Sequence, residues 1–444
     1  MMIDPLGERL LRHGQDHLAD HLGTLSGAVH DAFRRELESV DWERAASMHR
    51  HAGPHVAPLL PEGLAPIPST EPDASQRDGF WQEGLAMLAR GEAAFVLMAG
   101  GQGSRLGFDG PKGACPLGLP DDLVLFEVVV RRLLRLGELS GKIPPFAVMT
   151  GPENDAATRE WFKDRTGPAV PGSRASWPSL FLQSAAPALD DDGKALVSES
   201  GKLALVPDGN GGIWERLRDA GILDAWAAAG VKWIHVAGVD NLLSLPCDPV
   251  FLGFAKAAGH PLSCKSVLRT DPSEKVGVYV LDGDRHPRVA EYTELPPETA
   301  GARAADGLPV FREANIASHL LTLDLARSFA EQELPWHLAR KKIPHVDPVS
   351  GHDLSDRSGC KYERFLFDAF PSASGMSVLR VSRAGEFAPV KNAQGVDSPQ
   401  TAREALENLH RSWIAAWGEH RDPPWVDPME SFSGERPTKT STRS

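Results

Sequence analysis

The sequence is poor in cysteine, contains no long apolar run and has no excess of positive charge. Its 444 residues include four cysteines, which lie far apart and form no Cys-x-x-Cys pair, so neither a zinc site nor a disulfide framework is indicated. No stretch approaches the roughly 18 apolar residues of a membrane-spanning helix, and the opening residues, MMIDPLGERLLRHG, lack the apolar segment of a signal peptide. We therefore expect a cytoplasmic protein with no membrane partner.

The charge balance is acidic, with 47 lysines and arginines against 60 aspartates and glutamates and a formal net charge of −13. An acidic chain argues against nucleic acid as a partner. A polyanionic substrate would have to be met by a few locally placed cations. The length exceeds what one hydrophobic core usually holds and favours two or three domains.

A glycine-rich segment follows a short apolar run at residues 95–98, which we predict to be a buried strand. The next residues are Ala-Gly-Gly-Gln-Gly, with glycine at Gly100, Gly101 and Gly103. A loop with so few Cβ atoms lets an anion such as phosphate lie directly on backbone N–H groups.

Two cations, Arg105 and Lys112, follow these glycines and could hold a polyphosphate. The segment is not a P-loop, because Lys112 lies between Pro111 and Gly113, and it lacks the third glycine of a dinucleotide fingerprint, where Leu106 stands. The alternative is a glycine-rich turn with two surface cations.

The first 50 residues carry leucines at helical spacing and predict a helical segment. His13, His17 and His21 are spaced by four residues, so they could bind a metal on one helix face or form a polar face in solvent. Residues 51–78 are rich in proline and predict a linker or an extended wrap rather than a packed element.

Strand-like runs then alternate with helical patterns. A strongly apolar helix is predicted over residues 123–136, and Asn154 or Asp155 can cap a helix. Such alternation implies an α/β fold with a mostly parallel sheet covered by helices on both faces. The strand-like runs are residues 95–98, 146–149 and 231–236.

Asp240 follows the last of these strands, at the end where parallel sheets bind ligands. A carboxylate in that place can hold Mg²⁺ against substrate phosphates, since Mg²⁺ usually takes one or two carboxylates together with phosphate oxygens. The alternative is a helix or turn cap, because aspartate is common at both.

Two further loops carry polar residues. Residues 207–212, PDGNGG, are either a hairpin turn or a second binding loop that offers N–H groups and one amide to a ligand such as a sugar. Lys391 lies in a polar loop before a helix that Ser398 or Thr401 can start. The last twenty residues are low in apolar content, and we expect them to be frayed or disordered.

Taken in order, these segments are specific in combination, and over residues 91–417 the chain resembles the eukaryotic-type UDP-N-acetylglucosamine pyrophosphorylases of the wider UDP-sugar pyrophosphorylase family. The motifs that carry the resemblance are LMAGGQGSRLGFDGPKG, VMTGPENDAATREWF, PDGNGGIW, VDNLLSLPCDPVFLGF, VAEYTEL, ANIASHLLT, KYERFLFDAF and EFAPVKNA followed by SPQTAREAL.

The resemblance implies a Rossmann-like, glycosyltransferase-A-like nucleotidyltransferase core that uses Mg²⁺ to transfer UMP from UTP to a sugar 1-phosphate, most simply N-acetylglucosamine 1-phosphate. It implies an N-terminal helical segment and linker at residues 1–88, the core at 89–384, and a C-terminal lysine loop, helix and disordered tail at 385–444. Eukaryotic members continue with a further β-rich domain, whereas this chain ends soon after Trp417. We expect a monomer.

The resemblance also implies the site residues. Gln183 matches the position that contacts uracil, which suits an amide because it can donate and accept in one plane. By the same resemblance, the nucleotide is bound by Gly100, Gly101, Gly103, Gln183 and Gly209, and the sugar by Asn210, Gly211, Glu291 and Asn315, with Tyr292 beside them. Mg²⁺ is held by Asp240, and the phosphates are held by the catalytic residues Arg105, Lys112 and Lys391.

Three alternatives remain open at this stage. The acceptor could be glucose 1-phosphate or a broad set of sugar 1-phosphates. The protein could be a non-catalytic UDP-sugar binder, which would predict loss of the phosphate cations or the metal carboxylate. It could be an unrelated glycosyltransferase whose metal motif is Asp282-Gly283-Asp284, although these residues are expected in the turn of a hairpin over residues 276–294.

Overall fold

A computed structural model describes residues 4–51, 63–163, 165, 177–348, 350–354 and 357–437. The chain divides into two compact units, and no helix in the described ranges is long and apolar enough to cross a membrane. The smaller unit comprises Met1–Pro58, Gln183–Gly212 and Glu333–Asp368, and the larger comprises Leu59–Leu182, Ile213–Gln332 and Ala369–Ser444. The domain boundaries expected from the sequence stay predictions.

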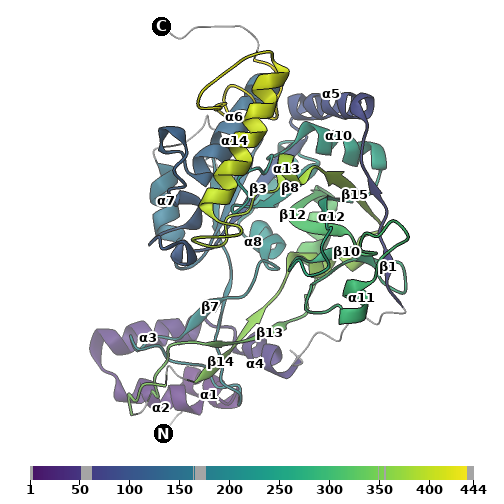
Figure 1. The fold of residues 1–444 in the computed structure, drawn as a ribbon. Coiled ribbons are helices and arrows are strands. Elements are labelled where there is room, and N and C mark those ends of the chain that lie inside the picture. Colours follow the sequence, from purple (N-terminus) through teal and green to yellow (C-terminus); the bar gives the residue numbers. More distant parts are fainter. Residues whose placement is uncertain are drawn as a thin grey trace. The chain divides into compact units, whose positions relative to one another are not determined.

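The larger unit is built on a mixed sheet with helices packed against it (Figure 1). Its strands are β1 (Ala65–Pro66), β2 (Ser69–Thr70), β3 (Ala93–Ala99), β4 (Phe146–Thr150), β5 (Ser179–Leu182), β8 (Trp233–Gly238), β9 (Leu262–Leu268), β10 (Val278–Leu281), β11 (Pro287–Ala290), β12 (Glu313–Thr322) and β15 (Met376–Val381). Its helices are α5 (Ala74–Arg90), α6 (Leu125–Ser140), α7 (Asp155–Lys163), α8 (Ile213–Asp219), α9 (Ile222–Ala228), α10 (Pro249–Ala258), α11 (Pro297–Gly301), α12 (Leu323–Ala330), α13 (Arg383–Glu386) and α14 (Pro399–Ala416), with 3₁₀ turns η2 (Ser104–Leu106), η3 (Lys112–Ala114) and η4 (Pro120–Asp122).

The strand order is β2-β15-β9-β12-β8-β3-β4-β5, with β10 pairing to β1, β11 and β12. β8, β3, β4 and β5 are parallel neighbours, and so are β9, β15 and β2, whereas β12 runs antiparallel to both β8 and β9. The predicted mostly parallel sheet is therefore confirmed. Because β8, β3 and β4 share a direction, the segments that follow them leave the sheet at one edge.

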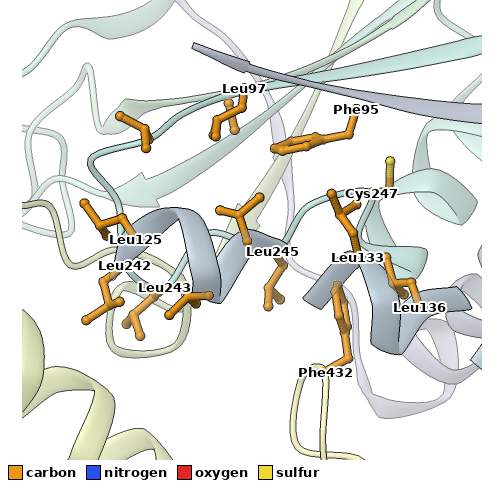
Figure 2. Close-up of a cluster of buried hydrophobic side chains, with 14 of the residues drawn as sticks. Phe95, Leu97, Leu125, Leu133, Leu136, Leu242, Leu243, Leu245, Cys247 and Phe432 are labelled. Atoms are coloured by element: carbon orange, nitrogen blue, oxygen red, sulfur yellow. The ribbon is translucent and has the colours of Figure 1, made fainter. Parts of the chain in front are cut away.

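The core of this unit lies under β3, whose sequence AAFVLMA is apolar throughout, as expected for a parallel strand covered on both sides. Figure 2 shows Phe95 and Leu97 on one side of a cluster that includes Leu133 and Leu136 of α6 and Leu245. Full burial of each such side chain stabilises the fold by roughly 1.5–3 kcal/mol relative to exposure.

Close helix packing in this unit depends on two glycines. α5 and α10 lie side by side in Figure 1, and a Cβ at Gly84 would stand 2.0 Å from the carbonyl oxygen of Pro249. A Cβ at Gly253 would stand 2.1 Å from the carbonyl oxygen of Phe80. Only glycine therefore fits at either crossing point.

The expectation of a disordered tail is wrong for residues up to 437. Phe432 is fully buried and enters the same core cluster (Figure 2). Arg421 donates to both carboxylate oxygens of Glu430, and Val426 packs against Trp417. A few aromatic and aliphatic side chains at the right places are enough to fix a segment whose average composition is polar. Residues 438–444 lie outside the described ranges.

The smaller unit gathers three separate stretches of chain around its own apolar cluster, which joins leucines of the N-terminal helices to Tyr362 and Val197. The helices are α1 (Pro5–Arg12), α2 (Asp16–Thr24), α3 (Gly27–Ser39) and α4 (Trp42–His51); the strands are β6 (Ala185–Pro187), β7 (Leu205–Pro207), β13 (His337–Lys342) and β14 (Ser358–Glu363). The 3₁₀ turn η5 (Leu366–Ser372) follows β14. The predicted N-terminal helical segment is confirmed for the described residues.

The predicted single helix face of three histidines is absent from this unit. The chain turns at Gly14, where φ is +71°, so His13 follows α1 while His17 and His21 lie on α2. His17 contacts the carbonyl of Ala195 at 2.9 Å. No group of three or more metal-ligating side chains occurs among the described residues, so the metal alternative for these histidines is not supported.

Candidate active site

The glycine-rich loop leaves the carboxyl end of β3 and folds back on itself. The N–H of Gly103 donates to the carbonyl of Gly110 at 2.8 Å, and the N–H of Lys112 donates to the carbonyl of Gly101 at 3.1 Å. The backbone of Lys112 is thereby fixed beside Gly101. The N–H of Gly103 is used within the loop and is not available to a ligand. Arg105 is exposed on η2. Neither Arg105 nor Lys112 forms an ion pair with a carboxylate in the described part of the chain, which leaves both charges for a ligand.

Asn154 holds this loop from the end of the neighbouring strand β4. Its fully buried side chain donates to the carbonyls of Ala99 (2.9 Å) and Gly101 (3.0 Å) and accepts from the N–H of Gly151 at 2.7 Å. The sequence suggested only a helix cap at this position. The amide instead satisfies three backbone groups of two adjacent loops, which neither a carboxylate nor a hydroxyl could do.

Asp240 follows β8 at the same edge of the sheet, and its carboxylate bends back over Gly238, where a Cβ would lie 2.9 Å from Oδ1. The carbonyl of Asp240 accepts from the N–H of Val390 at 2.8 Å. Lys391 is the next residue along the chain, so the fold brings it to the Asp240 segment. The ammonium of Lys391 lies 3.7 Å from the carboxylate of Asp397 and is about half exposed.

A buried charge cluster that sequence reasoning missed stabilises this junction. Lys265 on β9 donates to Asp248 (2.6 Å) and to Glu386, and all three side chains are buried. Burial opposes the charge on Lys265, yet the two carboxylates raise its pKa above the ordinary lysine value. The carbonyl of Glu386 in turn accepts from the side chain of Asn241 at 2.7 Å. The signal in the sequence was the single lysine in the strand LSCKSVL.

Glu291 and Asn315, the predicted sugar contacts, both border Gly277. The N–H of Asn315 donates to the carbonyl of Gly277 at 2.8 Å, and a Cβ at Gly277 would lie 2.9 Å from Oε1 of Glu291. The structure thus places these two side chains near one another although they are 24 positions apart in the sequence. Tyr292 is 44% exposed.

The predicted base and sugar contacts of the smaller unit also meet one another. Gln183 donates from Nε2 to the carbonyl of Gly209 at 2.6 Å. The N–H of Gly211 donates to the carbonyl of Arg364, and Oδ1 of Asn210 accepts from the N–H of Leu366. Residues 207–212 lead from β7 into α8, so the hairpin-turn alternative is wrong.

Arg364 and Asp208 are the residues that fix this second loop, and sequence reasoning missed both. Arg364 Nη2 donates to Asp208 Oδ2 at 2.7 Å, and both side chains are buried. Gly209 has φ +84°, and a Cβ there would lie 2.2 Å from the carbonyl oxygen of Arg364. The glycine is required by both its backbone conformation and this close approach.

Asp282-Gly283-Asp284 forms the turn between β10 and β11, as expected. Oδ1 of Asp282 accepts from the N–H groups of Asp284 and His286, and Oδ2 accepts from Arg288. A carboxylate with both oxygens engaged in its own turn is a structural group, so the glycosyltransferase metal motif is not supported.

The larger unit therefore presents a glycine-rich loop, two cations that pair with no carboxylate in the described ranges, and Asp240 at the carboxyl edge of a mostly parallel sheet. This combination defines an α/β nucleotidyltransferase. The model of the family described as UTP–glucose-1-phosphate uridylyltransferase matches residues 72–402, and the chain belongs to this family.

Named relatives extend over nearly the whole chain. It is 33% identical to the human UDP-N-acetylhexosamine pyrophosphorylase-like protein 1 over 96% of this chain and 92% of that protein. It is also 33% identical to the UDP-N-acetylglucosamine pyrophosphorylase of Saccharomyces cerevisiae, over 92% and 87% of the two chains.

Two solved structures share the fold. The UDP-N-acetylglucosamine pyrophosphorylase from Trypanosoma brucei, in complex with an inhibitor, has a TM-score of 0.79 at 27% identity and covers 96% of this chain and 92% of its own. A putative UDP-N-acetylglucosamine pyrophosphorylase from Entamoeba histolytica has a TM-score of 0.75 at 29% identity, over 84% and 96% of the two chains. The protein is an enzyme, a UTP-dependent sugar-1-phosphate uridylyltransferase that releases pyrophosphate.

Proposed function

We propose that the acceptor is N-acetylglucosamine 1-phosphate and that the reaction depends on Mg²⁺. The observation that carries the choice of acceptor is the 33% identity, over more than nine-tenths of this chain, to relatives named for N-acetylated sugars. The family description names glucose 1-phosphate instead, which keeps that sugar as the second candidate.

The chemistry needs no covalent intermediate with the enzyme. An oxygen of the sugar phosphate attacks the α-phosphorus of UTP, and pyrophosphate leaves. Catalysis is then positioning together with stabilisation of negative charge on the transferring group and the leaving group. In our proposal Arg105 and Lys112 hold the triphosphate and the departing pyrophosphate, and Lys391 adds a third cation. The two uncompensated charges beside the glycine-rich loop support these roles.

We assign the nucleotide and sugar to the remaining residues. Gly100, Gly101 and Gly103 line the phosphates, although Gly103 contributes shape rather than its N–H, which the loop already uses. The amide of Gln183, with Gly209, contacts the uracil; Nε2 donates one of its two protons to Gly209, so the oxygen and the second N–H are the groups offered to the base. The sugar is contacted by Asn210, Gly211, Glu291 and Asn315.

Asp240 is the residue that would hold Mg²⁺. The described residues contain no cluster of three or more metal-ligating side chains, and one carboxylate completed by phosphate oxygens is the donor set Mg²⁺ commonly accepts. Bound there, the ion would neutralise phosphate charge. In our proposal Lys391, which follows the residue bonded to the Asp240 carbonyl, adds a positive charge for the same phosphates.

The acceptor is tested by measuring pyrophosphate release from UTP with N-acetylglucosamine 1-phosphate, N-acetylgalactosamine 1-phosphate and glucose 1-phosphate in parallel. We expect the highest kcat/KM with the first. A pocket that hydrogen-bonds the acetamido group can reject glucose 1-phosphate by a large factor, whereas one that merely tolerates it cannot. A higher kcat/KM with glucose 1-phosphate would overturn the proposed acceptor and leave uridylyl transfer intact.

The metal is tested by chelation and by Asp240→Asn. We expect activity to disappear with EDTA and to return with Mg²⁺, and the variant to need a higher Mg²⁺ concentration for half-maximal rate. Asp397→Asn, on the Lys391 loop, is the matched control for loss of one nearby carboxylate. An unchanged Mg²⁺ titration in Asp240→Asn would exclude direct ligation by Asp240.

We further propose that the enzyme is a cytoplasmic monomer. Its four cysteines are unpaired and buried, which suits a reducing compartment. Sedimentation equilibrium would test the monomer, and a mass of twice 48.0 kDa would overturn it.

A further inference from the structure

A buried tyrosine contacts one of the proposed sugar-binding residues. Tyr279, on β10, is 1% exposed, and its hydroxyl donates to Oδ1 of Asn315 at 2.9 Å. The contacts of the same hydroxyl with the carbonyl of Lys265 (3.3 Å) and Nδ1 of His319 (3.5 Å) are longer. His319 Nδ1 also lies 3.3 Å from the thiol of Cys264, a second donor for that nitrogen. The Tyr279 hydroxyl therefore donates its proton to Asn315 rather than to Lys265 or His319.

The orientation of the Asn315 amide is set independently by the backbone. The N–H of Ala317 donates to the same Oδ1 at 2.8 Å, so the oxygen and nitrogen of the amide cannot be interchanged. Ala317 has φ +54° and lies where the register of β12 with β9 shifts between Asn315 and His319. The distorted strand thus turns a backbone N–H toward the side chain two residues before it.

Two donors on Oδ1 fill the acceptor capacity of that oxygen. The amide is left with Nδ2 as the group it can offer, and Nδ2 forms no hydrogen bond to another residue within the described ranges. Asn315 is then a donor only, suited to an acceptor oxygen such as a sugar hydroxyl or carbonyl. Burial raises the pKa of Tyr279 well above its ordinary value, which keeps the phenol protonated and able to donate.

We infer that Tyr279 is a positioning residue for sugar recognition, which acts by fixing the Asn315 amide so that it presents only its N–H₂ group to the substrate. The inference rests on the proposed role of Asn315 as a sugar contact. The torsion that rotates an asparagine amide is broad, so without the phenol the amide would be held by the Ala317 N–H alone. The reason for a polar tyrosine in this apolar part of β10 is then functional.

The first experiment compares Tyr279→Phe with the wild-type enzyme in steady-state kinetics, using the sugar 1-phosphate that is turned over best. Loss of one hydrogen bond should raise KM for the sugar 1-phosphate roughly three- to tenfold. KM for UTP and the thermal midpoint should stay within twofold and a few degrees of wild type. Tyr362→Phe is the matched control, since Tyr362 is equally buried and bonds His49 instead; its KM values should not change.

The second experiment is a double-mutant cycle with Asn315→Ala. If Tyr279 acts through Asn315, Tyr279→Phe should add nothing to KM for the sugar 1-phosphate once Asn315 is alanine. An equal rise in both backgrounds would overturn the inference, and so would an unchanged KM in Tyr279→Phe alone. If Asn315→Ala itself leaves that KM unchanged, the proposed sugar contact fails and the inference fails with it, while uridylyl transfer stands.

Discussion

The two glycine-rich loops of this enzyme look alike in sequence but are fixed in different ways. The first, at residues 100–112, is closed by its own backbone and held by Asn154, which follows the adjacent parallel strand. The second, at residues 207–212, is fixed by Arg364, which is 156 positions from Asp208 along the chain. The first loop is thus a product of local sheet topology, and the second depends on a distant segment that must fold onto it.

The largest effect on stability is expected from replacing Arg364, the distant residue that fixes the second loop. Arg364→Met removes the 2.7 Å partner of the buried Asp208 carboxylate, which keeps Ser184 (2.8 Å) and the more distant Arg44 (3.9 Å), so we expect the free energy of unfolding to fall by up to about 3–5 kcal/mol. Urea unfolding measures this change. Arg340→Met is the control in the same unit, because Arg340 is exposed, and it should leave the midpoint where it is. A small loss in Arg364→Met would mean that the second loop is held without its distant partner.

Low pH should destabilise the larger unit through its buried histidines. Three histidines of the larger unit are buried: burial lowers the pKa of His319 and of His410 to about 3, and that of His235 well below the ordinary value. Between pH 6.5 and about 3 the unfolded chain takes up protons that the folded chain excludes, so stability falls as pH falls, by up to about 1.4 kcal/mol per pH unit for each histidine.

Urea unfolding at pH 7.5 and 5.5 measures this effect. His410→Gln should reduce the difference between the two pH values by about a third, and an undiminished difference would contradict the assignment to His410.

The first loop should tolerate loss of its cations structurally but not catalytically. Lys112→Ala and Arg105→Ala should each lower kcat by ~10² or more, as for loss of one preorganised charge donor, with an unchanged thermal midpoint. Arg411→Ala, an exposed arginine on α14, is the control and should have wild-type kinetics. A wild-type rate in either cation variant would remove that residue from the mechanism.

Asn154→Ala tests whether the first loop depends on the hydrogen bonds of the Asn154 side chain. The change removes the side-chain partner of the Ala99 carbonyl and the Gly151 N–H and leaves the Gly101 carbonyl with the N–H of Lys112, so we expect stability to fall by about 1–3 kcal/mol and KM for UTP to rise. Asn154→Asp cannot donate to the carbonyls and should not rescue either property. Full activity in Asn154→Asp would show that the hydrogen bonds from the Asn154 amide to the two carbonyls are not required.

The smallest effect on stability is expected for Gly101→Ala. Comparing it with Gly209→Ala shows how differently the two loops tolerate a Cβ atom. The nearest atom to a Cβ at Gly101 is Lys112 Cε at 4.0 Å, so Gly101→Ala should leave stability unchanged and raise KM for UTP a few-fold where the ligand lies on the loop. Gly209→Ala should instead be destabilised by about 1 kcal/mol or more, because of its positive φ and the Arg364 carbonyl. Loss of stability in Gly101→Ala would remove the contrast.

Much of the fold followed from local pattern. The strands at residues 95–98 and 146–149, the helix at 123–136 and the helix that starts at Ser398 all occur within a few residues of their expected places. These segments combine strong periodicity with turn or capping residues. The His13 region failed because a single glycine at positive φ breaks a leucine pattern that would otherwise continue.

The candidate site was recoverable only in part. Glycines beside cations, and a carboxylate after a strand, can be recognised as a candidate phosphate and metal site from sequence, because few other roles use such combinations. Sequence reasoning did not find Asn154, Arg364 or the Lys265 cluster. The partners of Asn154 are backbone groups, and Arg364 and Glu386 are more than a hundred positions from Asp208 and Lys265. The packed segment around Phe432 was missed because average composition says nothing of where one aromatic side chain is buried.

The sequence by itself determined the class of fold, the chemistry of the first loop and the family to which the enzyme belongs, because each is written in short motifs whose backbone demands are local. The tertiary structure alone decided that β12 enters the sheet antiparallel, that residues 183–212 and 333–368 join the N-terminal helices, and that Tyr279 meets Asn315. Those outcomes depend on pairing and burial between distant segments, and the free energy of such contacts exists only once the chain has folded.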